Sequence, residues 1–438
     1  MAKVAAWAPG RELRYFRNVR EALGSGLPLI LAVEEGVHPI RGAFGALLGA
    51  AERGLLAYSS YWTYSGEVKA LPPLPDITGR FPYGPLRAYL RKRLLELEVE
   101  PSPAWEYDAQ LRGFERGLLA EPVPEPLYFW SPGLRPRPDL RQHLEEISAE
   151  PPLWDPFASL RADPEAERIF KAFLKRQCAF LGLRRSESFP AGKGDYPVFA
   201  TIAIPVRNRA ELIPDALKSA LSQTFKDYEV LVVDNASTDG TPEVVRKFNG
   251  VRLIQNPPGD VSDALNAALR HARGKYFIQL DSDDALAPEA VEECVRYMEA
   301  HPEVALAISY YEVCDESLRP TGFVVKHLEF DPDNLLRTEG AGALRCWRTE
   351  ALRRLGGFSN LYAGYGEDYD AVLRTSERWL VGRIHRVLYF YRRHPGNQDA
   401  RRPLLERLKK KTAARLSALH RRKLLNFSLR APISPPGA

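Results

Sequence analysis

The feature that most constrains this chain is an alternation of strand-like and helix-like segments that begins at Val198. The segments "VFATIAIPV", "YEVLVVDN" and "KYFIQLDSDD" are rich in apolar and β-branched residues. Between them, "ELIPDALKSALSQ" and "VSDALNAALRHA" have helical spacing of their apolar residues. Such alternation predicts an α/β fold with a parallel sheet and right-handed crossovers. Ligands of such sheets bind beyond the carboxyl ends of the strands.

Polar residues stand where these predicted strands end. Arg207 and Asn208 follow the first strand, Asp234 and Asn235 end the second, and the cluster Asp281–Asp284 ends the fourth. Neighbouring carboxylates repel each other, and burying them without a partner costs several kcal/mol. A divalent ion would relieve this repulsion and bridge to phosphate oxygens. The sequence has neither a Walker lysine loop nor a G-x-G-x-x-G after the first strand. A cation in place of a phosphate-binding loop suits a nucleotide-sugar site.

Five motifs follow one another in a familiar order. They are "TIAIPVRNRAELIPDALKSALSQTFKDYEVLVVDNASTDGT", "LDSDD", "LGGF", "GEDYD" and "YRRHPGN". In this order they resemble family 2 glycosyltransferases with the GT-A fold, over about residues 198–397. The resemblance implies a Rossmann-like, mostly parallel sheet flanked by helices. It also implies transfer of a sugar, with inversion, from a nucleotide-diphospho-sugar such as a UDP-sugar to an acceptor hydroxyl, with Mn²⁺ or Mg²⁺ as cofactor.

The resemblance assigns the donor side of the site to residues that follow the strands. Asp234 matches the residue that binds the nucleotide base, and Pro205 and Arg207 match the loop beside the nucleoside. Asp281 and Asp283 match the D-x-D pair, the first nearer the ribose and both close to the metal. Arg207 departs from the aromatic residue often found at its position. For Asp234 the alternative is a turn residue that accepts a hydrogen bond from its own backbone.

The acceptor side of the site is assigned in the same way. Asp368 matches the general base that takes the proton of the acceptor hydroxyl, and Glu367 would orient it or bind the acceptor. His394 matches a histidine metal ligand. The alternatives are that both acidic residues only complement a helix dipole and that His394 is structural. Asp284 either caps a following helix or supports the metal site from behind.

The N-terminal region repeats part of this pattern. Glu106–Trp130 aligns with Asp368–Tyr391, and Leu31–Pro39 aligns with Leu280–Pro288. In this alignment Ala32 replaces Asp281 and Trp105 replaces Glu367. The region therefore resembles the second half of a GT-A domain without the strands that hold a nucleotide. We expect it to supply a packing surface, for the catalytic domain or for a second subunit in a homo-oligomer, and not a second active site.

These patterns predict four regions along the 438 residues: a degenerate GT-A-like α/β half domain (1–135), a proline-rich and helical linker (136–195), the catalytic domain (196–400) and a basic amphipathic C-terminal helix and tail (401–438). A net charge of +5 is too small to indicate nucleic-acid binding. The cysteines Cys178, Cys294, Cys314 and Cys346 have neither zinc nor disulfide spacing, so we expect them to be small core residues.

The chain has no predicted signal peptide or membrane span, so the sequence favours a cytoplasmic location. Its basic C-terminal helix has two interpretations: contact with the inner membrane surface, where it would meet a lipid-linked acceptor, or packing on the catalytic domain. The partners expected are a nucleotide-sugar donor and a saccharide or lipid-linked acceptor, for cell-surface polysaccharide, glycolipid or another glycoconjugate. Two other functions stay open, a non-catalytic sugar or nucleotide-binding module and a nucleotidyltransferase.

Overall fold

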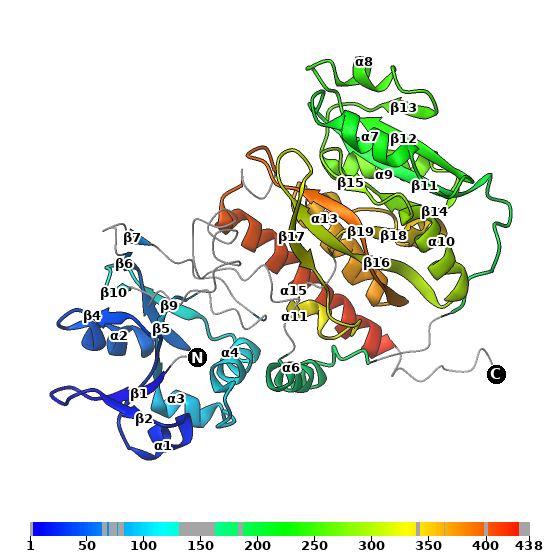
Figure 1. Cartoon of the computed structure of the whole chain (residues 1–438). Coiled ribbons are helices and arrows are strands. Elements are labelled where there is room, and N and C mark those ends of the chain that lie inside the picture. Colours follow the sequence, from blue (N-terminus) through cyan, green and yellow to red (C-terminus); the bar gives the residue numbers. More distant parts are fainter. Residues whose placement is uncertain are drawn as a thin grey trace, which may run out of the picture. The chain divides into compact units, whose positions relative to one another are not determined.

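The computed structural model describes residues 3–63, 68–69, 77, 83–130, 163–182, 187–338, 342–362, 364–397 and 402–428. The chain forms two compact units (Figure 1). The N-terminal unit comprises residues 1–156 and 163–177, and the C-terminal unit comprises 157–162 and 178–438. Most of the proline-rich stretch expected as a linker, residues 131–162, lies outside the described residues.

The C-terminal unit is built on a nine-stranded sheet in the order β13-β12-β11-β14-β18-β16-β19-β15, with β17 paired to β16. The strands are β11 (Val198–Val206), β12 (Tyr228–Asp234), β13 (Val251–Gln255), β14 (Gly274–Gln279), β15 (Ala285–Leu286), β16 (Val304–Cys314), β17 (Pro320–Val325), β18 (Arg345–Arg348) and β19 (Leu380–Arg392). Strands β11 to β14 pair in parallel, whereas β18 is antiparallel to both β14 and β16. The predicted α/β class is confirmed, with a parallel half and a mixed half.

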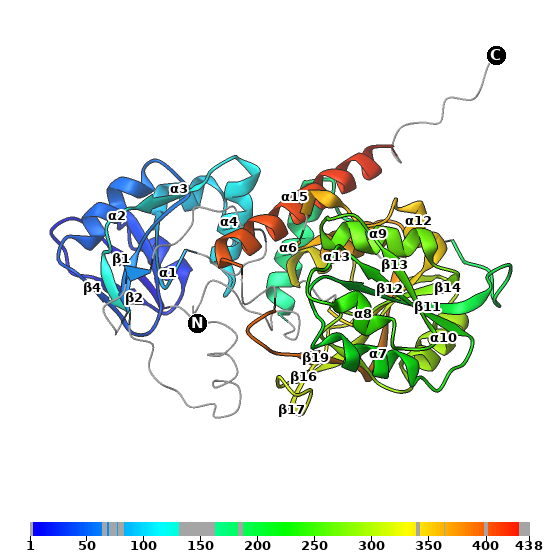
Figure 2. The same ribbon diagram turned by 90° about the horizontal axis from the view of Figure 1, so that it is seen from above.

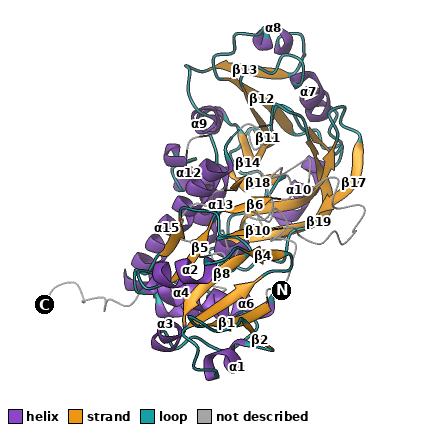
Figure 3. Cartoon of the chain, turned by 90° about the vertical axis from the view of Figure 1, so that its left-hand side faces the viewer, coloured by secondary structure: helices purple, strands orange, loops and turns teal. Residues whose placement is uncertain are grey.

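Helices cover both faces of this sheet (Figures 2 and 3). They are α7 (Ile213–Leu221), α8 (Thr241–Val245), α9 (Val261–His271), α10 (Ala290–Ala300), α11 (Leu335–Thr338), α12 (Thr349–Arg354), α13 (Glu367–Ser376) and α15 (Leu404–Ser428), with a 3₁₀ turn η2 at Asn360–Tyr362. Helices α7 and α10 lie on one face, and α9, α12 and α13 lie on the other.

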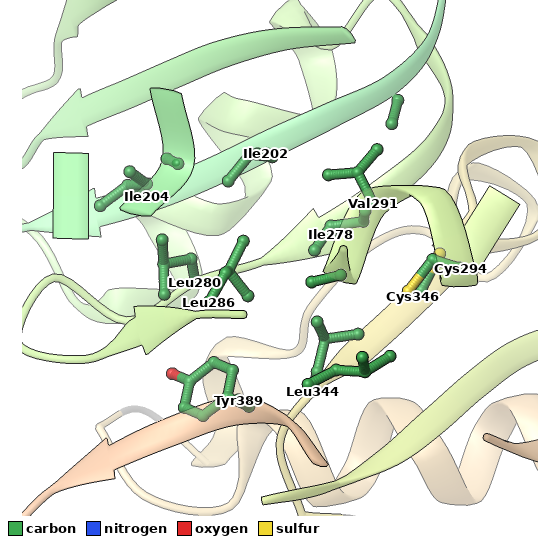
Figure 4. Packing of buried hydrophobic residues seen from close by; sticks show 14 of the residues in the cluster. Ile202, Ile204, Ile278, Leu280, Leu286, Val291, Cys294, Leu344, Cys346 and Tyr389 are labelled. Atoms are coloured by element: carbon green, nitrogen blue, oxygen red, sulfur yellow. The ribbon is translucent and has the colours of Figure 1, made fainter. Parts of the chain in front are cut away.

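The main core of the C-terminal unit lies between the sheet and helices α7 and α10. Successive side chains of a strand point to opposite faces, so Ile202 and Ile204 of β11 point the same way. They pack with Ile278 of β14 and Val291 of α10, all fully buried (Figure 4). Cys294 and Cys346 are part of this core and Cys314 is also buried, as expected of small core residues, whereas Cys178 is exposed and that expectation is wrong for it. The core fixes the strands whose carboxyl ends carry the polar residues.

The N-terminal unit contains a six-stranded sheet, β2-β1-β3-β8-β5-β9, and a four-stranded sheet, β4-β10-β6-β7. Its strands are β1 (Lys3–Trp7), β2 (Arg14–Phe16), β3 (Leu29–Val33), β4 (Val37–Pro39), β5 (Leu56–Ser59), β6 (Tyr61–Thr63), β7 (Val68–Lys69), β8 (Leu86–Leu90), β9 (Ala120–Val123) and β10 (Tyr128–Trp130). Its helices are α1 (Val19–Gly24), α2 (Ala43–Ala51), α3 (Arg91–Glu96), α4 (Trp105–Glu115) and α6 (Pro164–Arg176).

From β3 onward, the N-terminal unit has the same order and direction of elements as the C-terminal unit from β14 onward. Strand β8 is antiparallel to β3 as β18 is to β14, and β5 is parallel to β9 as β16 is to β19. Strand β4 is antiparallel to β10 as β15 is to β19. In the described part of the unit, β1 and β2 stand where β11 and β12 stand in the other sheet, but they pair antiparallel, and β13 has no counterpart. The described part of the N-terminal unit therefore has no parallel strands like β11, β12 and β13, and its assignment as a half domain stays a prediction.

Strand pairing corrects the alignment of the two copies at one point. Ala32 lies opposite Arg87, and Gln279 lies opposite Arg345. Strands β8 and β18 lead into α3 and α12 at equivalent positions, so these two arginines are equivalent. Ala32 therefore matches Gln279, and Glu34 stands where the other copy has Asp281. The sequence alignment was wrong by two residues, because a two-residue slip leaves every side chain on the same face.

Helix α6, expected within the linker, packs on α4 of the N-terminal unit. Phe170 stacks on Tyr107 with ring centroids 6.3 Å apart, and Phe173 meets Phe114 edge-on. In the C-terminal unit α15 packs on α13 in the same topological position. The repeated module thus includes a helix beyond its last strand.

Candidate active site

Two basic side chains lie close to the carboxylate cluster after β14. His394 Nε2 lies 3.1 Å from Asp283 Oδ2, and Arg209 Nε lies 3.6 Å from the same oxygen. Burial raises the pKa of Asp283, but His394 and Arg209 outweigh it and lower that pKa overall. Burial, and then the charge of Asp283, raises the pKa of Asp281 to about 6. The structure therefore brings His394 and Asp283 into contact, with Asp281 close enough to Asp283 for their charges to interact.

The donor set at this edge fits a divalent ion. Adjacent ligands of an octahedral ion, bound at ~2.1 Å, are about 3 Å apart, close to the 3.1 Å between Asp283 and His394. His394 Nδ1 accepts a hydrogen bond from the Gly396 amide at 3.1 Å, which puts the proton of a neutral ring on Nε2. Nε2 can bind an ion only in the other tautomer, with the proton on Nδ1. Among the described residues, no group of three or more His, Cys, Asp or Glu side chains is arranged as a complete metal site. Phosphate oxygens of a donor would have to supply further ligands.

Asp284 has a supporting role. Its carboxylate is buried and accepts hydrogen bonds from the Tyr389 hydroxyl at 2.7 Å and the Arg392 amide at 2.8 Å. It does not cap a helix, since two-residue strand β15 follows it directly. Asp284 thus joins the D-x-D loop to the end of β19, which leads to His394.

The nucleoside side of the site lies at the ends of β11 and β12. Asp234 is 2% exposed; its Oδ2 accepts a hydrogen bond from the Ser237 amide at 3.3 Å, while no described residue bonds its Oδ1. The carboxylate therefore makes the predicted turn contact and still has one oxygen available for a base. Pro205 is buried within β11 beside Val233 of β12, and Arg207 is exposed.

Sequence reasoning missed Arg209, two residues beyond Arg207. Its side chain reaches from the β11 loop to Asp283 and donates a hydrogen bond to the Gly396 carbonyl at 3.2 Å. Arg209 thus connects the nucleoside loop with the histidine loop. A third polar residue in "RNR" after the strand was the only signal, and it does not show which arginine turns inward.

Glu367 and Asp368 are the first two residues of α13. The helix starts after Gly366, whose φ of 102° is in the region that favours glycine. Asp368 Oδ1 accepts a hydrogen bond from the backbone amide of Tyr369 at 2.7 Å, and Oδ2 forms an ion pair with Arg345 of β18. Burial, and then the charge of Asp368, raises the pKa of Glu367 to about 8, and no described residue bonds its Oε2. Sequence reasoning missed Arg345 as well.

Helix α15 packs against α13 (Figure 2). Arg421 forms ion pairs with Glu377 at 2.9 Å and Asp370 at 3.4 Å, and fully buried Arg422 donates to the Pro332 carbonyl at 2.7 Å. The packing interpretation of the basic helix is therefore confirmed. None of the helices in the described part of the chain is long and apolar enough to span a bilayer.

A model of a known protein family matches part of the C-terminal unit. Residues 201–355 match the family model of glycosyl transferase family 2. The resemblance drawn from the motifs is confirmed. The matched segment contains the D-x-D cluster and Arg345, and ends before Glu367.

Similar proteins support this assignment over part of their length. The chain is 34% identical over 197 residues to a chondroitin synthase of Pasteurella multocida, and 31% identical over 201 residues to a chondroitin synthase of Escherichia coli. These matches cover 43% of this chain, but only 20% and 28% of the two relatives.

Solved structures give weaker similarities. Staphylococcus aureus TarS 1-349 in complex with UDP has a TM-score of 0.41 and 18% identity, over 54% of this chain and 67% of the other. A Pyrobaculum calidifontis mannosyltransferase in complex with GDP-Man and Mn²⁺ has a TM-score of 0.37 and 21% identity, over 62% and 84%. Similarity at this level adds nothing to the topology described above.

Proposed function

We propose that the chain is an inverting glycosyltransferase that transfers a sugar from a nucleotide-diphospho-sugar, such as a UDP-sugar, to an acceptor hydroxyl. The observation that carries the proposal is the placement of two carboxylate groups in one unit of family 2 topology. Asp281 and Asp283 follow β14, and Glu367 and Asp368 begin α13, with Arg345 of neighbouring β18 paired to Asp368. Chondroitin synthases among the relatives make polysaccharide synthesis the favoured process.

The donor would bind along the carboxyl ends of the parallel strands. The free oxygen of Asp234 is available for a hydrogen bond from the base, beside Pro205. Asp281, Asp283 and His394, the last in the tautomer with its proton on Nδ1, would hold Mn²⁺ or Mg²⁺. Such an ion supplies a Lewis acid for the negative charge on the leaving diphosphate. Arg209, beside Asp283, adds a fixed positive charge at the same place.

The transfer step needs a proton acceptor on the side of the acceptor hydroxyl. Asp368 takes this proton while the hydroxyl oxygen forms a bond to the anomeric carbon. The bond from that carbon to the phosphate oxygen breaks, and its electron pair leaves with the nucleoside diphosphate. Glu367, whose pKa of about 8 keeps it protonated at neutral pH, can donate a hydrogen bond to the acceptor from its unpaired side. One displacement inverts the configuration.

A screen of nucleotide sugars for release of nucleoside diphosphate tests this proposal directly. We expect release with one donor in the presence of Mn²⁺ or Mg²⁺, and loss of release with a chelator. Release that is unaffected by chelation would refute the metal role alone. No release from any nucleotide sugar, with saccharide or lipid-linked acceptors added, would refute the transferase. Contact with a membrane surface through α15 stays a prediction.

A further inference from the structure

Arg345 is buried between the two carboxylate groups of the site. Its side chain is 11% exposed and pairs with Asp368, and it is close enough to Asp281 for their charges to interact. Burial lowers the pKa of Arg345, but Asp368 and then Asp281 raise it, so the guanidinium stays charged. It is fixed by β18, which pairs with β14 on one side and β16 on the other. A cation on this rigid strand can set the position of a side chain at the start of α13.

The N-terminal unit carries the same arrangement at equivalent positions. Arg87 of β8 binds Glu106 of α4 through two hydrogen bonds of 2.9 and 3.0 Å, and it binds Glu34 at 2.9 Å. Glu106 is equivalent to Asp368, and Glu34 is equivalent to Asp281. Two copies that differ widely in sequence thus retain an arginine between the same two acidic positions. In both units the ion pair, Arg87–Glu106 or Arg345–Asp368, joins a strand of the sheet to the first turn of a helix.

The two carboxylates differ in how far they are available for chemistry. In the N-terminal copy both oxygens of Glu106 are bound by Arg87, and one also accepts the Tyr89 hydroxyl at 3.0 Å. The side chain of Glu106 is 10% exposed, whereas that of Asp368 is 28% exposed. Asp368 therefore keeps access to a substrate while Arg345 holds one of its oxygens.

We propose that Arg345 is the positioning residue for the base Asp368: it holds the carboxylate against β18 so that its accessible side meets the acceptor hydroxyl. This inference rests on the proposed glycosyl transfer and names a residue in it. Arg345 also offsets the repulsion between Asp368, Glu367 and Asp281, which would otherwise drive the first turn of α13 away from the D-x-D loop. Displacing a reacting group by ~1 Å costs about 100-fold in rate.

A double-mutant cycle in the full-length protein tests the proposal, with turnover as the readout and calorimetric donor binding as the check on folding. We expect Arg345→Met to lower kcat by about 10- to 100-fold and to change the donor Kd by less than about twofold. Arg345→Lys should recover part of the loss. In the Asp368→Asn background, Arg345→Met should cause no further loss, because the residue acts through Asp368. Arg87→Met is the matched control and should leave kcat unchanged.

Two results would overturn the proposal. The first is a wild-type kcat for Arg345→Met. The second is a loss of kcat from Arg345→Met that has the same factor in the Asp368→Asn background as in the wild-type background. The failure of the glycosyl-transfer proposal is separate, because it appears as no turnover by the wild-type protein, and this inference then fails with it. If Arg345→Met does not fold, as judged by lost donor binding, the cycle is made with Arg345→Lys and decides the question in the same way.

Discussion

The two copies of the repeated module, β3 to α6 and β14 to α15, differ in how exposed the acidic residue at the start of a helix is. Each has a strand arginine paired with an acid at the first turn of a helix. In the N-terminal unit Arg87 binds two glutamates, Glu34 and Glu106, and Trp105 precedes Glu106. In the C-terminal unit the acid has an ionisable neighbour, Glu367, and the three parallel strands β11, β12 and β13 stand beside the module. The comparison indicates that the donor half, and not the acid pair alone, distinguishes the candidate active site.

Other contacts of the two copies agree in detail. Asp108 and Arg112 of α4 repeat the ion pair of Asp370 and Arg374 in α13, at 2.8 and 2.7 Å. The Ser59 hydroxyl donates to the next carbonyl at 2.9 Å, as the Ser309 hydroxyl does. Tyr61 meets Trp130 edge-on, as Tyr311 meets Tyr391. We interpret the units as descendants of one duplicated module, of which, among the described residues, only the second has the parallel strands β11 to β13 beside it.

The largest expected effect is a difference in turnover between a variant of Asp368 and the matching variant of Glu106. Asp368→Asn removes the proton acceptor and keeps the size of the side chain, so we expect kcat to fall by about 10²- to 10⁴-fold with donor binding retained. Glu106→Gln makes the same chemical change in the N-terminal unit and should leave kcat within twofold of wild type. Turnover of both variants measures this difference. Near-normal turnover of Asp368→Asn would move the base to another residue, with Glu367 and Asp370 the next candidates.

A second comparison concerns the donor. We expect one nucleotide sugar per chain, bound in the presence of Mn²⁺, and affinity at least about 10-fold weaker with a chelator, because Asp281 and Asp283 then repel the diphosphate. Asp283→Asn should weaken metal-dependent binding, and Glu34→Gln in the N-terminal unit should not change it. Isothermal titration calorimetry gives both stoichiometry and affinity. Two donors per chain would contradict the assignment of the N-terminal unit as a half without a donor site.

A third comparison tests the helices that support the two modules. Arg421 of α15 pairs with Glu377, whose side chain is 5% exposed, while Arg176 of α6 pairs with Glu115, whose side chain is 17% exposed. Arg421→Met should destabilise the C-terminal unit by about 1–3 kcal/mol, because a buried carboxylate loses its partner. Arg176→Met should cost the N-terminal unit less than about 1 kcal/mol. Calorimetric melting of the full chain compares the two, and equal shifts would contradict the difference in burial.

The last expected effect depends on pH. The pKa of Glu367 is about 8 in the folded unit and 4.5 without its surroundings. The folded state therefore binds the extra proton, and its stability falls as the pH rises from about 4.5 to 8. Glu367→Gln removes this loss, so its melting temperature should exceed that of the wild type at pH 9 and equal it near pH 5. A rise of roughly 2–4 °C corresponds to 1 kcal/mol in a domain of this size. A difference that does not depend on pH would argue against the raised pKa.

Strand and helix periodicity was sufficient to predict the α/β class and the acidic strand ends. Apolar alternation places the sheet, and the carboxyl ends of parallel strands meet at one edge, so Asp234 and the Asp281–Asp284 cluster were expected near a ligand. The pairing of His394 with Asp283, across 111 positions of the sequence, came from motif order alone and agrees with the 3.1 Å contact. The repeat was also visible, because Y-D-A, L-R and L-Y-F recur in the same order.

Only the tertiary structure decided which charges neutralise the acids. Arg209 and Arg345 stand among 61 lysines and arginines, and nothing in their local sequence marks them as inward-facing. Their partners are 74 and 23 positions away along the chain, as Asp283 and Asp368. The match of Glu34 with Asp281 likewise needed the register of β3 against β8, since a slip of two residues preserves the alternation of faces. Local pattern determines which side of an element is buried, whereas the ion pairs depend on how distant elements pack.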